Sequence, residues 1–333
     1  MPNYTRDYLT ERHDDYESKF QDWNFHLLSY LGGQDYQNGY LLNRYVLESD
    51  EEYIKRMNNT AIDNHCKNVV QIYSSFLFRV PPTRNYGSLS GDEQLDNFLK
   101  DADLDGRSFD NIIREMQINA SIYGTCWAIM DKPAVQTETR AEEIQLDIRP
   151  YISVYTPENV LNWKYQRMIN GRYELTELTL LENLQNDVAT LRVWTKEDIT
   201  TLMVKEFNKG YSTSQPILID EMPNMINEIP AVVLYNQKSQ KRAIGISDLQ
   251  DVAELQKSIY NDYSEIEQLI RLSNHPSLVK TPNVEASAGA GSIIEIPEDM
   301  QSDLKPYIIQ PSSQSLTGIM DCINMKVDAI NRV

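Results

Sequence analysis

The chain has 333 residues, of which 41% are hydrophobic, and a formal net charge of −18. It can therefore bury a core, and it lacks the run of about 18 apolar residues that would predict a membrane-spanning helix. The acidity argues against a surface that grips DNA by neutralising phosphates, whereas an acidic wall that repels phosphates would let DNA slide. Three well-separated cysteines, Cys66, Cys126 and Cys322, predict reduced thiols in a cytosolic protein, and the first residues lack the apolar stretch of a secretory signal.

Residues 1–124 are predicted to be mainly helical. Ser49 followed by Glu52 has the pattern of a capping box, and the apolar spacing after it predicts one helix that ends near Phe78, before two prolines. A later helix is expected between a capping Ser108 and Gly124.

The stretch QDYQNGYLLNRY places Tyr36, Tyr40 and Tyr45 close together. Such rings could stack on sugars or bases, or they could form a protein–protein interface, where the ring is buried and the hydroxyl reaches the rim. Because basic residues do not surround these tyrosines, we favour the interface.

Residues 125–235 have the pattern of a β-rich region. The run TCWAIM after Gly124 predicts a buried strand, and short β-branched and aromatic runs separated by polar turns follow it. The run NEIPAVVLY predicts a last strand before the chain changes again. We therefore expect an α+β fold, with a helical part at 1–124 and an antiparallel β part at 125–235.

A long helix is predicted from Ser247 to Asn274. Ser247 followed by Gln250 indicates a second capping box, and Pro276 would end the helix. Apolar residues recur in steps of three and four along it. This stripe consists of Leu249, Val252, Leu255, Ile259, Tyr263, Ile266 and Ile270. Since such a half-polar rod has too little apolar surface to stand alone, we predict that the stripe packs between copies of the chain in a ring.

Three short strands are expected after this helix, in SLVKTP, GSIIEIP and KPYIIQP, with the flexible segment NVEASAGAG between the first two. A second helix begins at Ser313 or Ser315 and continues to the last residue. The predicted order is therefore long helix, small β-module and returning helix.

Sequence patterns for catalysis, metals or cofactors are weak. The AGAGS run is not followed by a helix that could bind phosphate, and the adjacent His65 and Cys66 would point in different directions on a helix. The DADLDG run resembles half of a calcium loop, but Ile112 stands where the loop needs a glutamate. A glycan-processing enzyme would need paired carboxylates, and Glu174 and Glu177 fall on opposite faces of a strand. We therefore predict a protein that is not an enzyme and needs no cofactor.

The order of these parts resembles the portal proteins of tailed bacteriophages. The segment YIKRMNNTAIDNHCKNVVQIYSSFLFRVPP resembles the family's amino-terminal helix and the residues that follow it. The segment INASIYGTCWAIMD resembles the step from a helix into a strand in the same family. The segment PYISVYTPENVLNWKY is similar to a strand of the family's wing and the turn that follows it. The most specific resemblance is NEIPAVVLYN followed by GISDLQDVAELQKSIYNDYSEIEQLIRLSNHPSLV, where a strand precedes a Gly-x-Ser-Asp-Leu start of a long helix.

The resemblance implies a division into a wing at 1–246, a first stem helix at 247–274, a clip at 275–312 and the start of a second stem helix at 313–333. Portal proteins normally continue with a tunnel loop, a long wing helix and often a crown. We do not find these parts here, so we expect that the sequence stops early.

The resemblance also implies a function. The protein would form a ring, a dodecamer, at one vertex of the capsid in the virion, after assembly in the host cytoplasm. Double-stranded viral DNA would be packaged and ejected through the ring without contact to a membrane. Partners would be the terminase large subunit, head–tail adaptor proteins and the major capsid protein. The alternatives are another head–tail structural protein of the virion and, less favoured, a protein that binds or processes glycans.

Two sets of clip residues are implied as contact sites. Partner docking is expected at Ser277, Leu278, Val279, Ile293, Ile294, Ile296, Tyr307 and Ile308. Residues 247–333 contain 13 acidic and 6 basic side chains, so Lys280 and Lys305 beside the clip strands are exceptions. They could contact DNA phosphates, or they could be solvated or pair with Glu295 and Glu298 of neighbours, which we favour.

Overall fold

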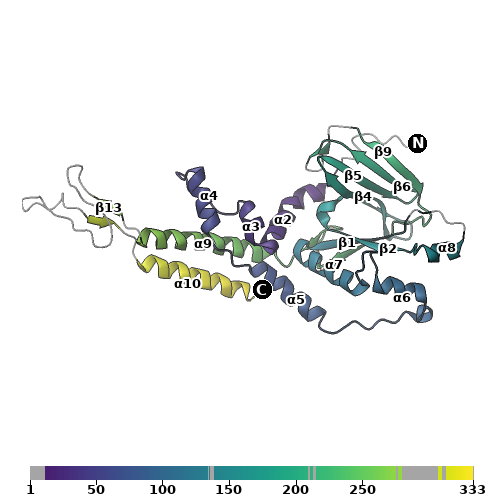
Figure 1. Ribbon diagram of the computed structural model, residues 1–333, viewed down its shortest axis with the longest axis horizontal. Coiled ribbons are helices and arrows are strands. Elements are labelled where there is room, and N and C mark those ends of the chain that lie inside the picture. The colour runs from purple at the N-terminus through teal and green to yellow at the C-terminus, as the bar shows by residue number, and fades with distance from the viewer. Residues whose placement is uncertain are drawn as a thin grey trace, which may run out of the picture. The chain divides into compact units, whose positions relative to one another are not determined.

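The computed structural model describes residues 12–133, 135, 139–208, 211–212, 215–274, 277–279, 307–309 and 313–332. Contacts between residues divide the chain into two compact units. The first comprises Met1–Tyr30 and Cys66–Asp251, and the second comprises Leu31–His65 and Val252–Val333. Helices and antiparallel sheets occur together, which confirms the α+β class (Figure 1).

The first unit is a three-layered body. Its helical elements are α2 (Asp14–Leu31), α5 (His65–Leu77), η1 (Gly87–Leu89), α6 (Glu93–Lys100), α7 (Phe109–Tyr123), α8 (Arg140–Gln145) and η2 (Pro157–Asn159). Helix α7 begins where the Ser108 side chain accepts the N–H of Asn111, and it ends at Gly124, whose φ of 88° is left-handed. Both predicted ends of this helix are therefore confirmed.

Two antiparallel sheets form the other layers. The smaller has the order β10–β1–β2, with β1 (Thr125–Asp131) between β2 (Tyr151–Tyr155) and β10 (Ala231–Tyr235). The larger is a five-stranded meander, β3 (Val160–Arg167), β4 (Tyr173–Gln185), β5 (Val188–Thr195), β6 (Asp198–Val204) and β9 (Ile217–Pro223). Two-residue strands form the short pairs β7 (Phe207–Asn208) with β8 (Tyr211–Ser212), and β11 (Gln237–Lys238) with β12 (Gly245–Ile246).

The core of this body lies against α7. Helix α7 covers one face of the smaller sheet and buries Ile112 and Met116 against Cys126, while the larger sheet lies on the sheet's other side (Figure 1). Each such side chain stabilises the fold by about 1.5–3 kcal/mol on burial. The three cysteines are free, as predicted, and burial raises the pKa of the Cys126 thiol to about 12, so it stays protonated.

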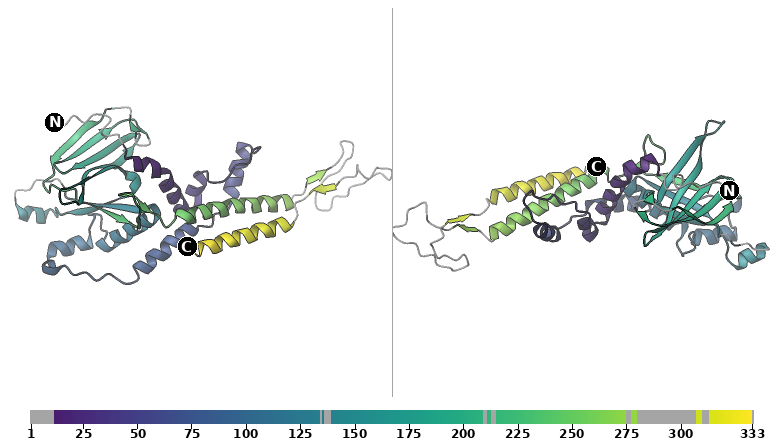
Figure 2. Two further views of the ribbon diagram at one scale, coloured as in Figure 1. Left: turned by 180° about the vertical axis from the view of Figure 1, so that it is seen from behind. Right: turned by 90° about the horizontal axis from the view of Figure 1, so that it is seen from above.

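The second unit is built on two antiparallel helices. It contains α3 (Gly33–Asn38), α4 (Asp50–Asn59), nearly all of α9 (Gln250–Asn274), β13 (Ser277–Val279), β14 (Tyr307–Ile309) and α10 (Ser313–Ile330). Helices α9 and α10 lie side by side and run in opposite directions (Figures 1 and 2). The 25 residues of α9 extend for about 38 Å at the usual rise of an α-helix. The two helices and the first and third predicted strands, β13 and β14, are confirmed, while the second predicted strand, in GSIIEIP, lies outside the described residues.

The helix predicted to end near Phe78 is in fact two helices. Helix α4 ends at Thr60, whose hydroxyl donates to the carbonyl of Arg56 at 2.7 Å, and α5 begins only at His65. The intervening residues include Asp63 and Asn64, whose short polar side chains favour non-helical backbone. The predicted capping box of Ser49 with Glu52 is confirmed. No helix within the described part of the chain is both long and apolar enough to cross a membrane.

Candidate functional site

The start of α9 is anchored to the end of α7. The hydroxyl of Ser247 accepts the N–H of Leu249 at 2.9 Å and lies 2.6 Å from the carbonyl oxygen of Ile122. The helix therefore begins at Gln250, three residues later than predicted, and the expected capping box of Ser247 with Gln250 is wrong. The hydroxyl was recognised as a cap from sequence, but its contacts with α7 connect residues far apart in the chain.

Asp248 completes this anchor. Its carboxylate accepts hydrogen bonds from the Ser121 hydroxyl and, at 2.7 Å, from the side-chain amide of Asn236. The backbone N–H of Asp248 donates to the carbonyl of Ser121 at 3.1 Å. The serine and aspartate of the Gly-x-Ser-Asp-Leu sequence thus form hydrogen bonds with polar groups at the end of α7. Backbone groups there would otherwise lack a partner, because the helix ends.

The glycine of this sequence permits a close backbone contact. A Cβ atom on Gly245 would lie 2.1 Å from the carbonyl oxygen of Gly124, and one on Gly124 would lie 2.6 Å from the carbonyl oxygen of Gly245. Any side chain at either position would therefore force the two backbones apart. We call the group Ser121, Gly124, Gly245, Ser247 and Asp248 the α9 anchor.

The predicted stripe on α9 falls into two parts. Leu249, Val252 and Ile259 are buried within the chain itself. Leu255, which lies between them, is half-buried, as are Tyr263 and Ile266 farther along, and Ile270 is 40% exposed. The chain covers the first part of the stripe, so the part that remains available to a second copy is the carboxyl-terminal part.

Residues 31–65 pack on the side of α9, although the resemblance assigned them to the wing. Arg56 is buried, and its guanidinium binds the carboxylate of Glu48 at 2.7 Å and the hydroxyl of Ser264 at 2.8 Å. It also donates to the carbonyl of Asn43 at 2.6 Å and lies 4.1 Å from the ring centre of Tyr45. The hydrogen bond from Arg56 lowers the pKa of Glu48, so the pair remains charged.

Further polar contacts fix the same segment. The side-chain oxygen of Asn261 on α9 accepts the backbone N–H of Asn43 at 2.7 Å, and its amide donates to the carbonyl of Leu41 at 3.3 Å. The hydroxyl of Tyr45 donates to Glu265, and burial together with this bond raises the pKa of Tyr45 to about 12. The segment is therefore held along α9 by side chains from several of its turns.

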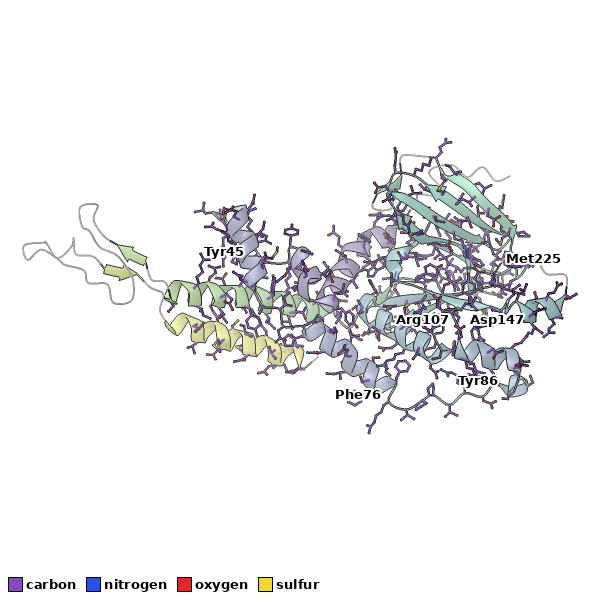
Figure 3. All side chains as sticks on the ribbon, viewed as in Figure 1. Tyr45, Phe76, Tyr86, Arg107, Asp147 and Met225 are labelled. Atoms are coloured by element: carbon purple, nitrogen blue, oxygen red, sulfur yellow. The ribbon has the colours of Figure 1, made fainter. Side chains whose placement is uncertain are left out.

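The three clustered tyrosines have different surroundings. Tyr36 is fully buried and meets the ring of Tyr260 edge-on at 5.3 Å. Tyr45, labelled in Figure 3, packs on Arg56. Tyr40 is exposed and stacks on Tyr53. Packing within the chain thus accounts for Tyr36, whereas Tyr45 is 40% and Tyr40 69% exposed, so parts of both rings could contact another molecule.

Helix α10 has one face toward the chain and one toward solvent. Ile323 and Ile330 are buried, and Lys326 forms an ion pair with Asp262 of α9. Met320 and Met325 are exposed, the latter at 71%. The second helix therefore presents apolar surface that its own chain leaves uncovered.

The clip is described only in its two short strands. β13 and β14 pair antiparallel, with Leu278 opposite Ile308. This pairing aligns the backbones of five of the predicted docking residues, which are Ser277, Leu278, Val279, Tyr307 and Ile308. The remaining predicted contact residues, Ile293, Ile294, Ile296, Lys280 and Lys305, lie outside the described residues.

The acidic sequences considered for chemistry have structural roles. Burial raises the pKa of Asp103 in the DADLDG loop, but hydrogen bonds from Arg107 and two backbone amides overcome this and lower it to about 2. Glu174 pairs with Lys196 at 2.6 Å and Glu177 pairs with Lys164 at 3.0 Å, in separate bridges. Among the residues that the structure describes, no three histidine, cysteine or acidic side chains are grouped to bind a metal.

The fold places two antiparallel helices, α9 and α10, before and after the paired strands β13 and β14 in the chain. The sequence model of one family, phage portal protein, SPP1 Gp6-like, matches residues 5–315. The chain therefore belongs to this phage portal family, whose members are structural components of the virion. Comparison with curated proteins gives no significant match.

Proposed function

We propose that the protein forms a closed ring at one vertex of the capsid and that viral double-stranded DNA passes through this ring during packaging and ejection. The observation that carries the proposal is the antiparallel pair α9 and α10, whose apolar surface is only partly covered by its own chain. Copies placed side by side around an axis would cover the rest.

Several exposed apolar side chains lie on three helices. Ile270 is on α9, Met320 and Met325 are on α10, and Phe76, labelled in Figure 3, and Leu77 are at the end of α5. Each exposed apolar side chain costs free energy in water, and contact with another copy would remove it from water. We propose that these helices contact neighbouring copies, in a ring of twelve as the resemblance implies.

The charge of the same region suits a channel. Residues 247–333 contain 13 acidic and 6 basic side chains, and on α9 Asp251, Glu254 and Glu267 are exposed. Acidic side chains around a bore would repel phosphates and deny DNA fixed binding points. This charge favours a channel through which DNA passes, rather than a surface that binds DNA tightly.

The remaining roles follow the proposed division into wing at 1–246, stem helices at 247–274 and from 313, and clip at 275–312. We propose that the clip docks the terminase large subunit and later the head–tail adaptor proteins, and that the wing contacts the major capsid protein. A separate motor would hydrolyse ATP, so this subunit would act as a structural protein. Lys280 and Lys305 remain candidates for contact with DNA at the clip.

The ring is tested with the purified protein. We expect negative-stain electron microscopy to show closed rings with a central opening, and native mass spectrometry to give one subunit number. The variant with Met320→Asp and Met325→Asp places charges on the exposed face of α10 and should remain monomeric. The matched control is Ile169→Asp, which alters a fully exposed side chain in the turn after β3 and should still form rings. A wild-type protein that stays monomeric at high concentration would refute the proposal.

A further inference from the structure

We propose that the outer edge of β9 and the cavity at its end bind an extended peptide segment of another protein, one in which a run of apolar side chains lies next to basic ones. The inference concerns a face of the first unit and does not depend on the ring. Strand β9 is the last strand of the five-stranded meander and, among the residues that the structure describes, pairs on one side only, with β6. Its outer N–H and C=O groups have no strand partner within that part of the chain and could pair with a further strand.

The exposed side chains of β9 favour a partner of this kind. Ile217, Leu218 and Ile219 are all about half exposed, which is unusual for three consecutive aliphatic residues in a strand. Asp220 and Glu221 follow them and are also exposed. If two copies of this edge paired antiparallel, their acidic side chains would face one another, which destabilises a sheet. A basic segment from another protein would instead find opposite charges.

A cavity lies where β9 ends. It has a volume of about 390 Å³ and is situated between the ends of the two sheets. Its walls include Met130, Trp194, Ile199, Met222, Ile226 and Pro230. This volume and the mainly apolar lining are typical of sites that accept a large side chain.

The rim of the cavity is held in place. The side-chain amide of Asn224 donates to the carbonyls of Thr195 and Glu228, both at 2.9 Å, and its oxygen accepts the N–H of Ile226 at 3.2 Å. Met225, labelled in Figure 3, is nevertheless 85% exposed. A fixed loop that presents an exposed methionine loses little conformational entropy on binding, so the rim is preorganised for a partner.

Trp194 supplies an unused hydrogen-bond donor in the cavity wall. Its side chain is only 2% exposed, and its Nε1–H finds no acceptor among the residues that the structure describes. A buried donor without a partner destabilises the free protein, and it is rare in native folds. The Nε1 atom is itself buried, so an added peptide would contact the apolar parts of the cavity wall and fill the cavity with an apolar side chain.

The probe is a displayed library of random linear peptides of about eight residues, the length of a long edge strand. We expect the selected peptides to contain a run of apolar residues next to basic ones. The variant with Met225→Ser and Ile226→Ser removes exposed apolar side chains from the rim of the cavity, so peptide affinity should fall by about 3- to 10-fold. Because both side chains are exposed, this variant should be about as stable to heat as the wild type.

Charge provides an independent measurement. Glu221→Lys should weaken binding of the selected peptides about 10-fold, whereas the control Asp105→Lys, an equal charge change in an exposed loop away from β9, should leave it unchanged. The proposal is wrong if no peptide is selected or if binding survives both the double serine variant and Glu221→Lys. It is also wrong if substituting Met225 and Ile226 by serine changes the subunit number, because the edge would then contact a second copy.

Discussion

Two positions of the α9 anchor, Gly124 and Gly245, have room only for glycine. The backbones at Gly124 and Gly245 approach so closely that neither has room for a Cβ atom. The position of α9's first turn therefore depends on these residues as much as on the hydrogen bonds of Ser247 and Asp248.

Gly245→Ala should reduce the free energy of unfolding by more than about 2 kcal/mol, because its Cβ would meet backbone that cannot yield as a side chain can. Gly318→Ala is the matched control. An added Cβ there meets nothing within 4 Å, and the residue lies inside α10, so this change should stabilise the protein by about 0.5–1 kcal/mol. Urea unfolding followed by circular dichroism measures both, and equal effects would contradict the argument.

The buried pair of Arg56 and Glu48 should give the second unit a pH dependence. The hydrogen bond from Arg56 keeps the pKa of Glu48 lower in the folded protein than in the unfolded chain. Such a carboxyl stabilises the fold above its unfolded-state pKa, and the stabilisation is lost as pH falls through the folded-state value.

We therefore expect the stability difference between wild type and Glu48→Gln to shrink as the pH is lowered from about 5. Urea unfolding of both proteins over a pH series measures it. Arg56→Met at neutral pH should cost about 3–5 kcal/mol, since it leaves a buried carboxylate without a partner, and the double variant should recover part of this loss. A difference that does not change with pH would show that Glu48 does not titrate with folding.

At the scale of elements, periodicity and end signals predicted what is local in the chain. The steps of three and four along α9, and Ser108 and Gly124 around α7, are confirmed because neighbouring residues alone determine them. The break after Thr60 was missed, since the apolar spacing continues through it and the short polar side chains there were given too little weight. The sequence predicts a capping box of Ser247 with Gln250. The actual partners of Ser247 lie on α7, more than a hundred residues away in the chain, where local patterns give no information.

The packing of residues 31–65 on α9 could not have been predicted from one sequence for the same reason. Tyr45 and Glu265 are 220 residues apart, and propensity carries no information about such pairs. The cavity beside β9 and the unsatisfied Trp194 were also missed. They depend on how two sheets meet, and the sequence signal there was only a tryptophan near the end of a strand.

The contacts of residues 31–65 with α9 can be weakened selectively. Tyr45→Phe with Asn261→Ala removes hydrogen bonds to Glu265 and to the backbone of Asn43 without removing the buried Arg56. Hydrogen–deuterium exchange should become faster in α3 and α4 and remain unchanged in β1 and β5. Tyr40→Ala, which alters the exposed tyrosine, is the control and should leave exchange in α3 and α4 nearly unaltered. Unchanged exchange in the double variant would mean that these bonds do not hold the segment.

At the scale of the whole molecule, the net charge of −18 predicts weak retention of DNA. The purified protein should not retard linear double-stranded DNA in a gel at physiological salt. Replacing exposed Glu254 and Glu267 on α9 by lysine should produce retardation that fades as salt is raised, because added cations release counterions from DNA. Lysines at Asp105 and Asp187, far along the chain from α9, provide a charge-matched control. Strong retardation by the unaltered protein would contradict the idea of a sliding surface.

The distribution of thiols makes the native protein suitable for labelling at one position. Cys66 and Cys126 are buried and their pKa values are raised to about 12, whereas Cys322 is exposed on α10. A maleimide dye would therefore react with α10 alone, without any engineered substitution. Energy transfer between donor- and acceptor-labelled copies would then report how close the α10 helices of neighbouring molecules come, and how that spacing changes when DNA or a partner arrives.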